Sequence, residues 1–277
     1  MVSPLQPPSV ALDRAALSFG ERTLWTELTL DIPQGEYFAV LGPNGSGKST
    51  FLKTLLGLLP LSDGSVRVLG ETVRRGNPQI GYVPQQRPFS PDTPLRARDL
   101  VGMGLDGHRW GPGLLSRKRR ARVDESLERV GAKEYAAVPV GLLSGGEQQR
   151  LRVAQALASR PRLLLCDEAL LSLDLRHQSA VSRLIEDYRE ESGATVVFVT
   201  HEINPIIDDV DRVLYLANGR FTVGSVEEVM TTKTLTRVYD APVNVIQVDG
   251  RYIVVGAGSA SEVSGSDCHA HDIGGEA

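Results

Sequence analysis

Residues 37–50 read YFAVLGPNGSGKST, and this stretch decides the fold. It begins with the short apolar run Tyr37–Leu41, which lies between Gly35 and Gly42. A glycine-rich turn follows, and a helical pattern over Lys48–Leu59 comes next. Short apolar runs bounded by glycine are typical of buried strands. The stretch therefore predicts a strand, a tight turn and a helix in that order.

The glycine-rich turn matches the phosphate-binding pattern G-x-x-x-x-G-K-S. In this pattern glycines let backbone N–H groups converge on phosphate oxygens at the start of a helix. We expect Lys48 to reach the β and γ phosphates of a nucleotide and the Ser49 hydroxyl to bind Mg²⁺. A chance glycine-rich turn between a strand and a helix is the alternative. The predicted nucleotide-binding residues are Gly42, Asn44, Gly45, Ser46, Gly47, Lys48, Ser49 and Thr50.

Three further apolar runs, at 80–83, 163–166 and 195–199, resemble the first one. They are short and apolar on both faces, as expected of strands buried in a parallel sheet. Between the last two lies a segment with a 3.6-residue apolar period, which predicts a helix that ends at Gly193. Strands that alternate with helices predict a doubly wound α/β sheet, in which ligands bind at the carboxyl ends of the strands.

Polar residues follow these three runs. Gln85 comes after the first run, Asp167 and Glu168 after the second, and His201 after the third. An acidic pair that closes an apolar strand is costly unless cations or hydrogen bonds compensate it, which favours a metal–phosphate site. We expect Asp167, with Ser49 and Gln85, to hold Mg²⁺, and Glu168 to deprotonate the attacking water. His201 and Gln85 gain a catalytic role only as members of this group, since either alone is unremarkable.

A second glycine turn, LSGGEQQR at 143–150, opens onto a polar helix. Ser144, Gly145 and Gly146 offer a hydroxyl and N–H groups at a helix start, which is an anion site of the same kind as the first. In a compact α/β domain these residues would lie away from the first glycine-rich turn. The alternative is a glycine-rich cap before a helix over 147–159.

The segments GPNGSGKST, YVPQQ, LSGGEQQR, LLLCDEALLSLD and VTHE occur in the order found in ATP-binding cassette (ABC) ATPases. The chain resembles that family over residues 10–225. The resemblance implies a P-loop NTPase fold with a parallel-sheet core, an antiparallel β part and a helical subdomain, and it implies hydrolysis of ATP with Mg²⁺. In that family two cassettes pack head to tail, and the LSGG turn of one covers the ATP on the P-loop of the other. Ser144, Gly145 and Gly146 would therefore bind the partner's ATP.

The resemblance gives roles to two more residues. Phe19 matches the aromatic residue that stacks on adenine, and Asp174 matches the turn that is exchanged across the dimer. Simple core packing is the alternative for Phe19. The chain departs from the family at Ala169, where many members have proline after the catalytic glutamate. Both acidic residues are kept, so we expect activity, but the rigidity of the following loop is in doubt.

The rest of the chain suggests an insert and an extension. Residues 86–142 predict a mostly helical insert, whose amphipathic helix, marked by Val123 and Leu127, is closed by Gly131. Near the end, Asp249 and Gly250 form a favoured hairpin turn between two apolar runs. We therefore expect three parts: an ATPase domain over 10–225, a C-terminal extension with a small β-hairpin over 226–255, and a flexible tail over 256–277.

Composition limits the function classes. The 277 residues include 30 basic and 34 acidic ones, for a net charge of -4, so no overall positive field favours a nucleic-acid partner. Cys166 and Cys268 give no disulfide framework and suit a reducing compartment. The sequence has no secretion signal and no apolar run that approaches the roughly 18 residues of a membrane span. Transport would therefore require separate membrane subunits.

The resemblance also implies partners and a task. The insert resembles the region that receives short helices from the transmembrane permease subunits of bacterial importers, which puts the chain at the cytoplasmic face of the membrane beside a second ATPase subunit. The basic run Arg117–Arg122 is either a solvated helix start or a contact to lipid or partner. Residues 200–230 and the hairpin look like the ATPase subunits of zinc and manganese importers.

Two alternatives remain for the task. One is the same ATPase for another cargo, such as an iron chelate or an exported molecule. The other is a cassette that remodels DNA or ribosomes, but the long heptad-patterned insertion or the second cassette of such proteins is absent. The tail residues Cys268, His269, His271 and Asp272 are of types that zinc accepts. Four donors crowded into five residues rarely form a closed site, however, so a random polar tail is the favoured explanation.

Overall fold

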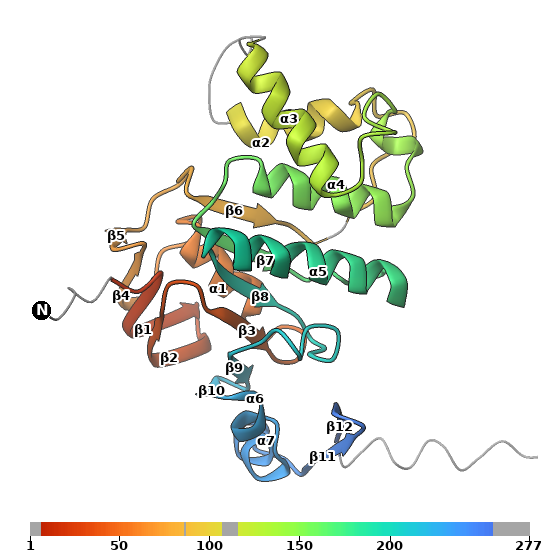
Figure 1. Cartoon of the computed structure of the whole chain (residues 1–277). Helices are drawn as coiled ribbons and strands as arrows, with labels where there is room; N and C mark the ends of the chain where they lie inside the picture. Colours follow the sequence, from red (N-terminus) through yellow and green to blue (C-terminus); the bar gives the residue numbers. More distant parts are fainter. Residues whose placement is uncertain (1–6, 86, 107–115, 257–277) are drawn as a thin grey trace, which may run out of the picture.

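The computed structural model describes residues 7–85, 87–106 and 116–256. Its centre is a six-stranded sheet in the order β10-β9-β3-β8-β7-β6, parallel except for the β9–β10 pair (Figure 1). The four runs predicted as strands are β3, β6, β7 and β8 of this sheet, so the predicted parallel core is confirmed. The strands are β3 (Tyr37–Leu41), β6 (Ile80–Val83), β7 (Leu163–Asp167), β8 (Thr195–Val199), β9 (Arg212–Ala217) and β10 (Arg220–Gly224).

Both faces of the central sheet are covered. The helices that cover it are α1 (Lys48–Leu55), α4 (Gly145–Leu157) and α5 (Leu175–Ser192). Phe38 and Val40 of β3 pack in one core with α1, whereas Ala39 and Leu41 pack in another with α4 and α5. Successive residues of a strand point to opposite faces, so burial on both faces explains the unbroken apolar run. Cys166 of β7 lies in the second core, where burial raises the pKa of its thiol.

An antiparallel sheet, in the order β2-β1-β4-β5, packs with α1 on the first face of the central sheet (Figure 1). Trp25 of β2 meets Phe51 of α1 edge to face, with their ring centroids 6.4 Å apart. This is the antiparallel part that the family resemblance implied. Its strands are β1 (Val10–Phe19), β2 (Arg22–Ile32), β4 (Asp63–Val68) and β5 (Glu71–Thr72).

Helix α1 is shorter than the sequence pattern indicated. It ends at Leu55, not at the predicted Leu59. Gly57 takes φ = 69°, and the Leu58 amide donates to the Lys53 carbonyl at 2.9 Å. A left-handed glycine with such a backward bond is a common helix stop, which the apolar period alone does not reveal.

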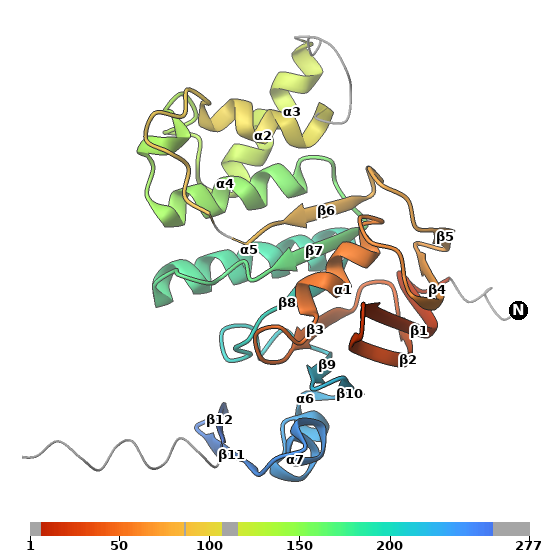
Figure 2. The same ribbon diagram turned by 180° about the vertical axis from the view of Figure 1, so that it is seen from behind.

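A helical part lies beyond β6, uppermost in Figures 1 and 2. It consists of α2 (Ala97–Asp106), α3 (Arg117–Arg129), the 3-10 turn η1 (Val140–Leu142) and α4. Val123 and Leu127 pack into its core, and Gly131 takes φ = 66° just after α3, so the predicted amphipathic helix is confirmed. Within the basic run that begins α3, Arg119 pairs with Asp106 at 2.5 Å, so part of the run binds its own chain.

The C-terminal part lies at the opposite end of the molecule (Figures 1 and 2). Strands β11 (Val243–Val248) and β12 (Arg251–Gly256) form the predicted hairpin, and Asp249 (φ = 49°) and Gly250 (φ = 75°) make its two-residue turn. Both positive φ values fit the turn type that favours Asp-Gly. Two helices that the sequence analysis did not predict precede the hairpin, α6 (Val226–Val229) and α7 (Thr232–Tyr239).

Candidate nucleotide site

The glycine-rich turn between β3 and α1 has a backbone that requires glycine. Gly42, Gly45 and Gly47 take φ values of 143°, 79° and 102°. A Cβ atom on Gly42 would lie 2.0 Å from the Leu216 carbonyl oxygen, far inside van der Waals contact. These positions strain any residue with a side chain. The turn therefore has the shape that the pattern predicted, and Asn44 and Gly45 are exposed on it.

The turn also contains polar groups that suit a phosphate. The Ser46 hydroxyl is buried and has no hydrogen-bond partner among the described residues. The Lys48 ammonium donates to the carbonyls of Gly42 at 2.7 Å and Pro43 at 3.0 Å, and its residue is only 4% exposed. Burial lowers the pKa of Lys48, and the nearby carboxylates oppose that shift. A buried donor without a partner and a buried cation bound to neutral carbonyls favour an anionic ligand.

Asp167, at the end of β7, is held by two hydroxyls. Ser49 Oγ donates to its Oδ1 at 2.9 Å, and the Tyr82 hydroxyl donates to its Oδ2 at 3.4 Å. Burial, and then the Asp167 carboxylate, raise the pKa of Tyr82 to about 12. The sequence analysis paired Ser49 with Asp167 but missed Tyr82, although its place in β6 beside β7 is the signal that could have found it. Hard oxygen donors in this arrangement suit Mg²⁺.

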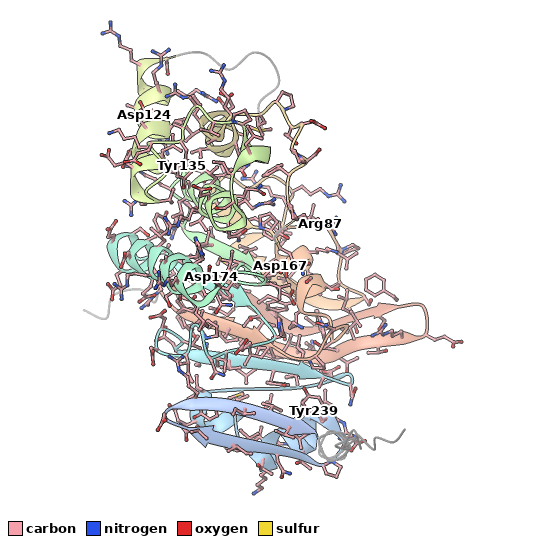
Figure 3. The ribbon with its side chains drawn as sticks, turned by 90° about the vertical axis from the view of Figure 1, so that its right-hand side faces the viewer. Arg87, Asp124, Tyr135, Asp167, Asp174 and Tyr239 are labelled. Carbon is pink, nitrogen blue, oxygen red and sulfur yellow. The ribbon has the colours of Figure 1, made fainter. Side chains whose placement is uncertain are left out.

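Glu168 contacts the two other residues that were predicted to be catalytic, Gln85 and His201. Gln85 Nε2 donates to Glu168 Oε2 at 2.9 Å, and His201 Nδ1 lies 3.7 Å from Glu168 Oε1. Glu168 has φ = 48°, and its amide donates to the Val199 carbonyl of β8 at 2.8 Å. A left-handed conformation is uncommon for glutamate and clusters at functional sites. The structure thus brings together Gln85, Glu168 and His201, as the strand-end argument predicted, and Figure 3 shows Asp167 at mid-height in the molecule.

Phe19 lies at the surface rather than in a core. Its residue is 50% exposed at the end of β1, so the core-packing alternative is wrong. It pairs with Arg22 in the β1–β2 register, and the Arg22 guanidinium donates to the Gly45 carbonyl at 2.8 Å. The hairpin that carries Phe19 therefore touches the glycine-rich turn. Arg22 was not predicted, because nothing in its local sequence indicates this contact.

The second glycine turn is a helix cap. Ser144 caps α4, because Glu147 N donates to its Oγ at 3.3 Å, while Ser144 N donates to Glu147 Oε2 at 2.8 Å. This capping box starts the helix at Gly145, two residues before the predicted range 147–159. Ser144 and Gly145 are exposed. The capping alternative is therefore confirmed as local structure, and it leaves this helix start at the surface.

The two glycine turns begin helices that lie in different parts of the molecule (Figures 1 and 2). In both views α4 lies with α2 and α3 in the helical part, whereas α1, which begins at the first turn, lies below β6. Residues 25–171 match the model of a protein family described as ABC transporter. The chain belongs to the ABC transporter family.

Known ABC proteins match the chain over most of its length. The manganese transport system ATP-binding protein MntB of Bacillus subtilis (strain 168) is 33% identical over 233 residues, 83% of this chain and 92% of MntB. The zinc import ATP-binding protein ZnuC of Yersinia pestis bv. Antiqua (strain Antiqua) is 35% identical over 228 residues, 82% of this chain and 83% of ZnuC. The iron(3+)-hydroxamate import ATP-binding protein FhuC of Bacillus subtilis (strain 168) is 32% identical over 242 residues, 86% of this chain and 90% of FhuC.

A solved structure gives the same result. A chain of a metal-chelate type ABC transporter in an inward-facing conformation aligns with a TM-score of 0.74 and 27% identity, over 89% of this chain and 95% of that one. The ABC ATPase fold that the sequence resemblance implied is therefore confirmed.

In this ABC protein, Asp174 lies next to the second glycine turn. It caps α5 by accepting from His177 N at 2.9 Å, and its Oδ2 lies 2.8 Å from His177 Nδ1. The backbone hydrogen bond from His177, followed by the side-chain one, lowers the pKa of Asp174. A Cβ atom on Gly146 would lie 2.2 Å from the His177 ring, so the ring packs directly on that glycine.

The loop that follows Glu168 is held by hydrogen bonds, although it has Ala169 where many family members have proline. Gln178 Nε2 donates to the carbonyls of Leu170 at 3.4 Å and Leu173 at 3.1 Å. The Leu171 amide donates to the Glu168 carbonyl at 3.1 Å, and Ala169 is fully buried. These bonds hold the loop without the fixed φ of a proline.

The segment after Gln85 is tied to α4. Phe89 N donates to Gln148 Oε1 at 3.2 Å, and the Arg152 guanidinium lies 4.7 Å from the Phe89 ring centroid. Arg152 also donates to the Arg87 carbonyl, and Figure 3 shows Arg87 between the helical part and the strands. Burial lowers the pKa of Arg152. This ABC protein thus links the strand-end group to the helix that begins at the second glycine turn.

The described residues were searched for a metal site and for a membrane-spanning helix. Within 7–85, 87–106 and 116–256, no three side chains of metal-binding type cluster closely enough to hold an ion. Cys268, His269, His271 and Asp272 lie outside the described residues. No helix in the described part of this ABC protein combines the length and apolar character that a bilayer span needs.

Proposed function

We propose that this chain is the Mg²⁺-dependent ATP hydrolase of an importer for zinc or manganese. It would work at the cytoplasmic face of the membrane, bound to separate permease subunits and to a second ATPase subunit. The observation that carries the hydrolase is the convergence of Ser49, Asp167, Gln85, Glu168 and His201 on neighbouring strand ends. The cargo is proposed from the names of relatives such as MntB and ZnuC.

The glycine-rich turn would hold the phosphates of ATP. Its backbone N–H groups and the Lys48 ammonium supply the donors, and the partnerless Ser46 hydroxyl supports an occupant at this place. Ser49, Asp167 and Gln85 would hold Mg²⁺, since their oxygen atoms are of the type that this ion binds. When bound, the ion neutralises charge that develops on the phosphate oxygens.

Glu168 would act as the base. Its carboxylate accepts a hydrogen bond from Gln85 and faces His201, so both neighbours orient it toward the end of the sheet. A water placed there would lose its proton to Glu168 as its oxygen attacks the γ phosphorus, and the bond to the ADP oxygen would break. His201 would contact the γ phosphate, and the products would be ADP and phosphate.

A second copy of this chain would complete the site. Ser144, Gly145 and Gly146 would bind ATP held by the partner, and Asp174 would lie at the exchanged turn. Two large apolar residues beside these positions support an interface, because Leu142 is 67% and Leu175 is 80% exposed. Both lie within two residues of Ser144 or Asp174 in the sequence. Contact with a partner would remove this apolar surface from water.

Replacing Phe19 with alanine is expected to weaken ATP binding while leaving triphosphate contacts intact. Stacking of a base on an aromatic ring is worth about 1–3 kcal/mol, so the dissociation constant should rise by roughly 5- to 150-fold. Titration with a fluorescent ATP analogue measures the change. Phe19→Tyr is the matched control and should bind almost as tightly as the unaltered chain. Equal affinity of Phe19→Ala and the unaltered chain would remove the stacking role.

Growth of a deletion strain tests the cargo. Cells that lack this chain should grow poorly under metal chelation and recover when zinc or manganese is added. The unaltered chain, supplied on a plasmid, should restore growth, and a Lys48→Ala chain should not. An iron chelate is the second candidate cargo, because the chain is similar to FhuC. Recovery of growth with an iron chelate alone would favour this cargo. Copurification with nucleic acid instead of a polytopic membrane protein would favour the non-transport alternative.

A further inference from the structure

The C-terminal hairpin contacts the segment that follows His201. Asn204 is the residue that makes this contact, three positions after His201. Its side-chain Nδ2 donates to the Tyr252 carbonyl at 2.9 Å, and its Oδ1 accepts from the Tyr252 amide at 2.8 Å. Arg251 donates to the Asn204 carbonyl. The Asn204 amide thus pairs with the outward backbone groups of β12 as a neighbouring strand would.

The segment after His201 is held in place by individual side-chain contacts. Residues 201–211 connect β8 to β9 through turns, without a regular helix or strand. Ile203 is buried in the core beneath the segment, which fixes one point on it. Thr200 bonds both the amide and the carbonyl of Glu202, which fixes another. Asn204 adds the hairpin as a further anchor, so that the backbone on the C-terminal side of His201 is also held from outside the ATPase sheet.

The hairpin in turn is anchored on two sides. A two-stranded hairpin is marginal alone and needs packing or bonding to other elements. On the β11 side, Thr236 Oγ1 of α7 donates to the Val243 carbonyl at 3.1 Å and accepts from the Val243 amide at 3.3 Å. On the β12 side, Asn204 makes the equivalent pair of bonds with Tyr252. The hairpin therefore joins α7 to the His201 segment.

We propose that the C-terminal hairpin positions His201 through Asn204. By fixing the backbone that follows His201, the pair of bonds to Tyr252 keeps the imidazole beside Glu168, where it lies 3.7 Å from the carboxylate. Asn204 is a positioning residue and does not touch the nucleotide. This inference rests on the proposed hydrolysis of ATP by the same site.

Steady-state ATPase assays on the full chain test the proposal. Asn204→Ala should lower kcat by about 10-fold, since small displacements of catalytic groups have effects of this size, while KM for ATP stays unchanged. Thr236→Val is the matched control, because it removes an equivalent pair of bonds on the β11 side of the hairpin. The Val245 amide still donates to the Thr232 hydroxyl of α7 at 2.9 Å, and the Asn204 bonds stay intact, so the hairpin keeps its place. Thr236→Val should leave kcat within twofold of the unaltered chain. Asn204→Asp keeps the oxygen that accepts from the Tyr252 amide, so its kcat should lie between those of Asn204→Ala and Thr236→Val.

A double-mutant cycle shows whether Asn204 acts through His201. In a His201→Ala chain, adding Asn204→Ala should cause no further loss, because the group that it positions is gone. A further 10-fold loss in that background would contradict the proposal, as would an unaltered kcat in Asn204→Ala. If Asn204→Ala unfolds, the cycle is run with Asn204→Asp. An unaltered chain without ATPase activity would contradict the proposed function, whereas an active chain that is insensitive at Asn204 contradicts only the hairpin's role.

Discussion

Replacing Glu168 with glutamine is expected to slow ATP hydrolysis by about 10²- to 10⁴-fold, the usual contribution of a general base. Glutamine keeps the size of the side chain, but its amide cannot take a proton from water. The measurement is phosphate release by the purified chain at saturating ATP and Mg²⁺. Because binding does not need the base, the variant should still bind ATP and form dimers with it.

Glu202→Gln is the matched control for this substitution. Glu202 is an exposed carboxylate next to His201, and it bonds Thr200 only through its backbone. Its replacement should leave turnover within twofold of the unaltered chain. Undiminished turnover of Glu168→Gln would remove Glu168 as the base, even though its hydrogen bond to Gln85 and its place beside His201 would stand.

Replacing Lys48 with alanine should abolish tight ATP binding. A hydrogen bond to a charged group contributes about 1.5–3 kcal/mol, so the dissociation constant should rise by roughly 10- to 150-fold. The loss should be greatest for ATP, whose γ phosphate Lys48 is expected to reach. Isothermal titration with ATP and Mg²⁺ measures it.

Lys53 of the same helix provides the control, since it is exposed and lies on α1 one turn beyond the site. Lys53→Ala should bind ATP as the unaltered chain does. If Lys48→Ala also keeps its affinity, the glycine-rich turn does not bind phosphate in the manner proposed.

The parts of the fold that could be predicted are those with local causes. The strand β3 and the start of α1 followed from an apolar run and a glycine turn that lie next to each other in the sequence. Parallel strands bring their carboxyl ends to one edge, which is why Asp167 and Glu168 could be placed beside residues far away in the chain. The hairpin followed from Asp249 and Gly250 between two apolar runs.

Errors occurred at helix ends and in two short helices. The end of α1 depends on the conformation of Gly57, and the start of α4 depends on the cap from Ser144. Periodicity reports the buried face of a helix but not where its last hydrogen bond lies. Helices α6 and α7 were missed although the sequence carries signals for both. Ser225 and Glu228 form a capping box at the start of α6, and Leu235 and Val238 of α7 are buried at helical spacing.

The site shows the same division. Ser49 and Asp167 were paired in advance because both belong to recognisable motifs. Tyr82 and Arg22 were missed because their contacts, to Asp167 and to the Gly45 carbonyl, arise from the packing of separate elements. The exposure of Phe19 also required the structure, since an aromatic residue at a strand end reads the same whether it is buried or not.

The central claim is that ATP is enclosed between two copies of this chain. The most direct measurement is a crystal structure of Glu168→Gln grown with ATP and Mg²⁺. The account predicts two chains head to tail, with the phosphates of each ATP between Lys48 of one chain and Ser144 of the other. A structure in which Ser144 contacts the phosphates bound by its own chain, or in which a single chain surrounds the ATP, would contradict it.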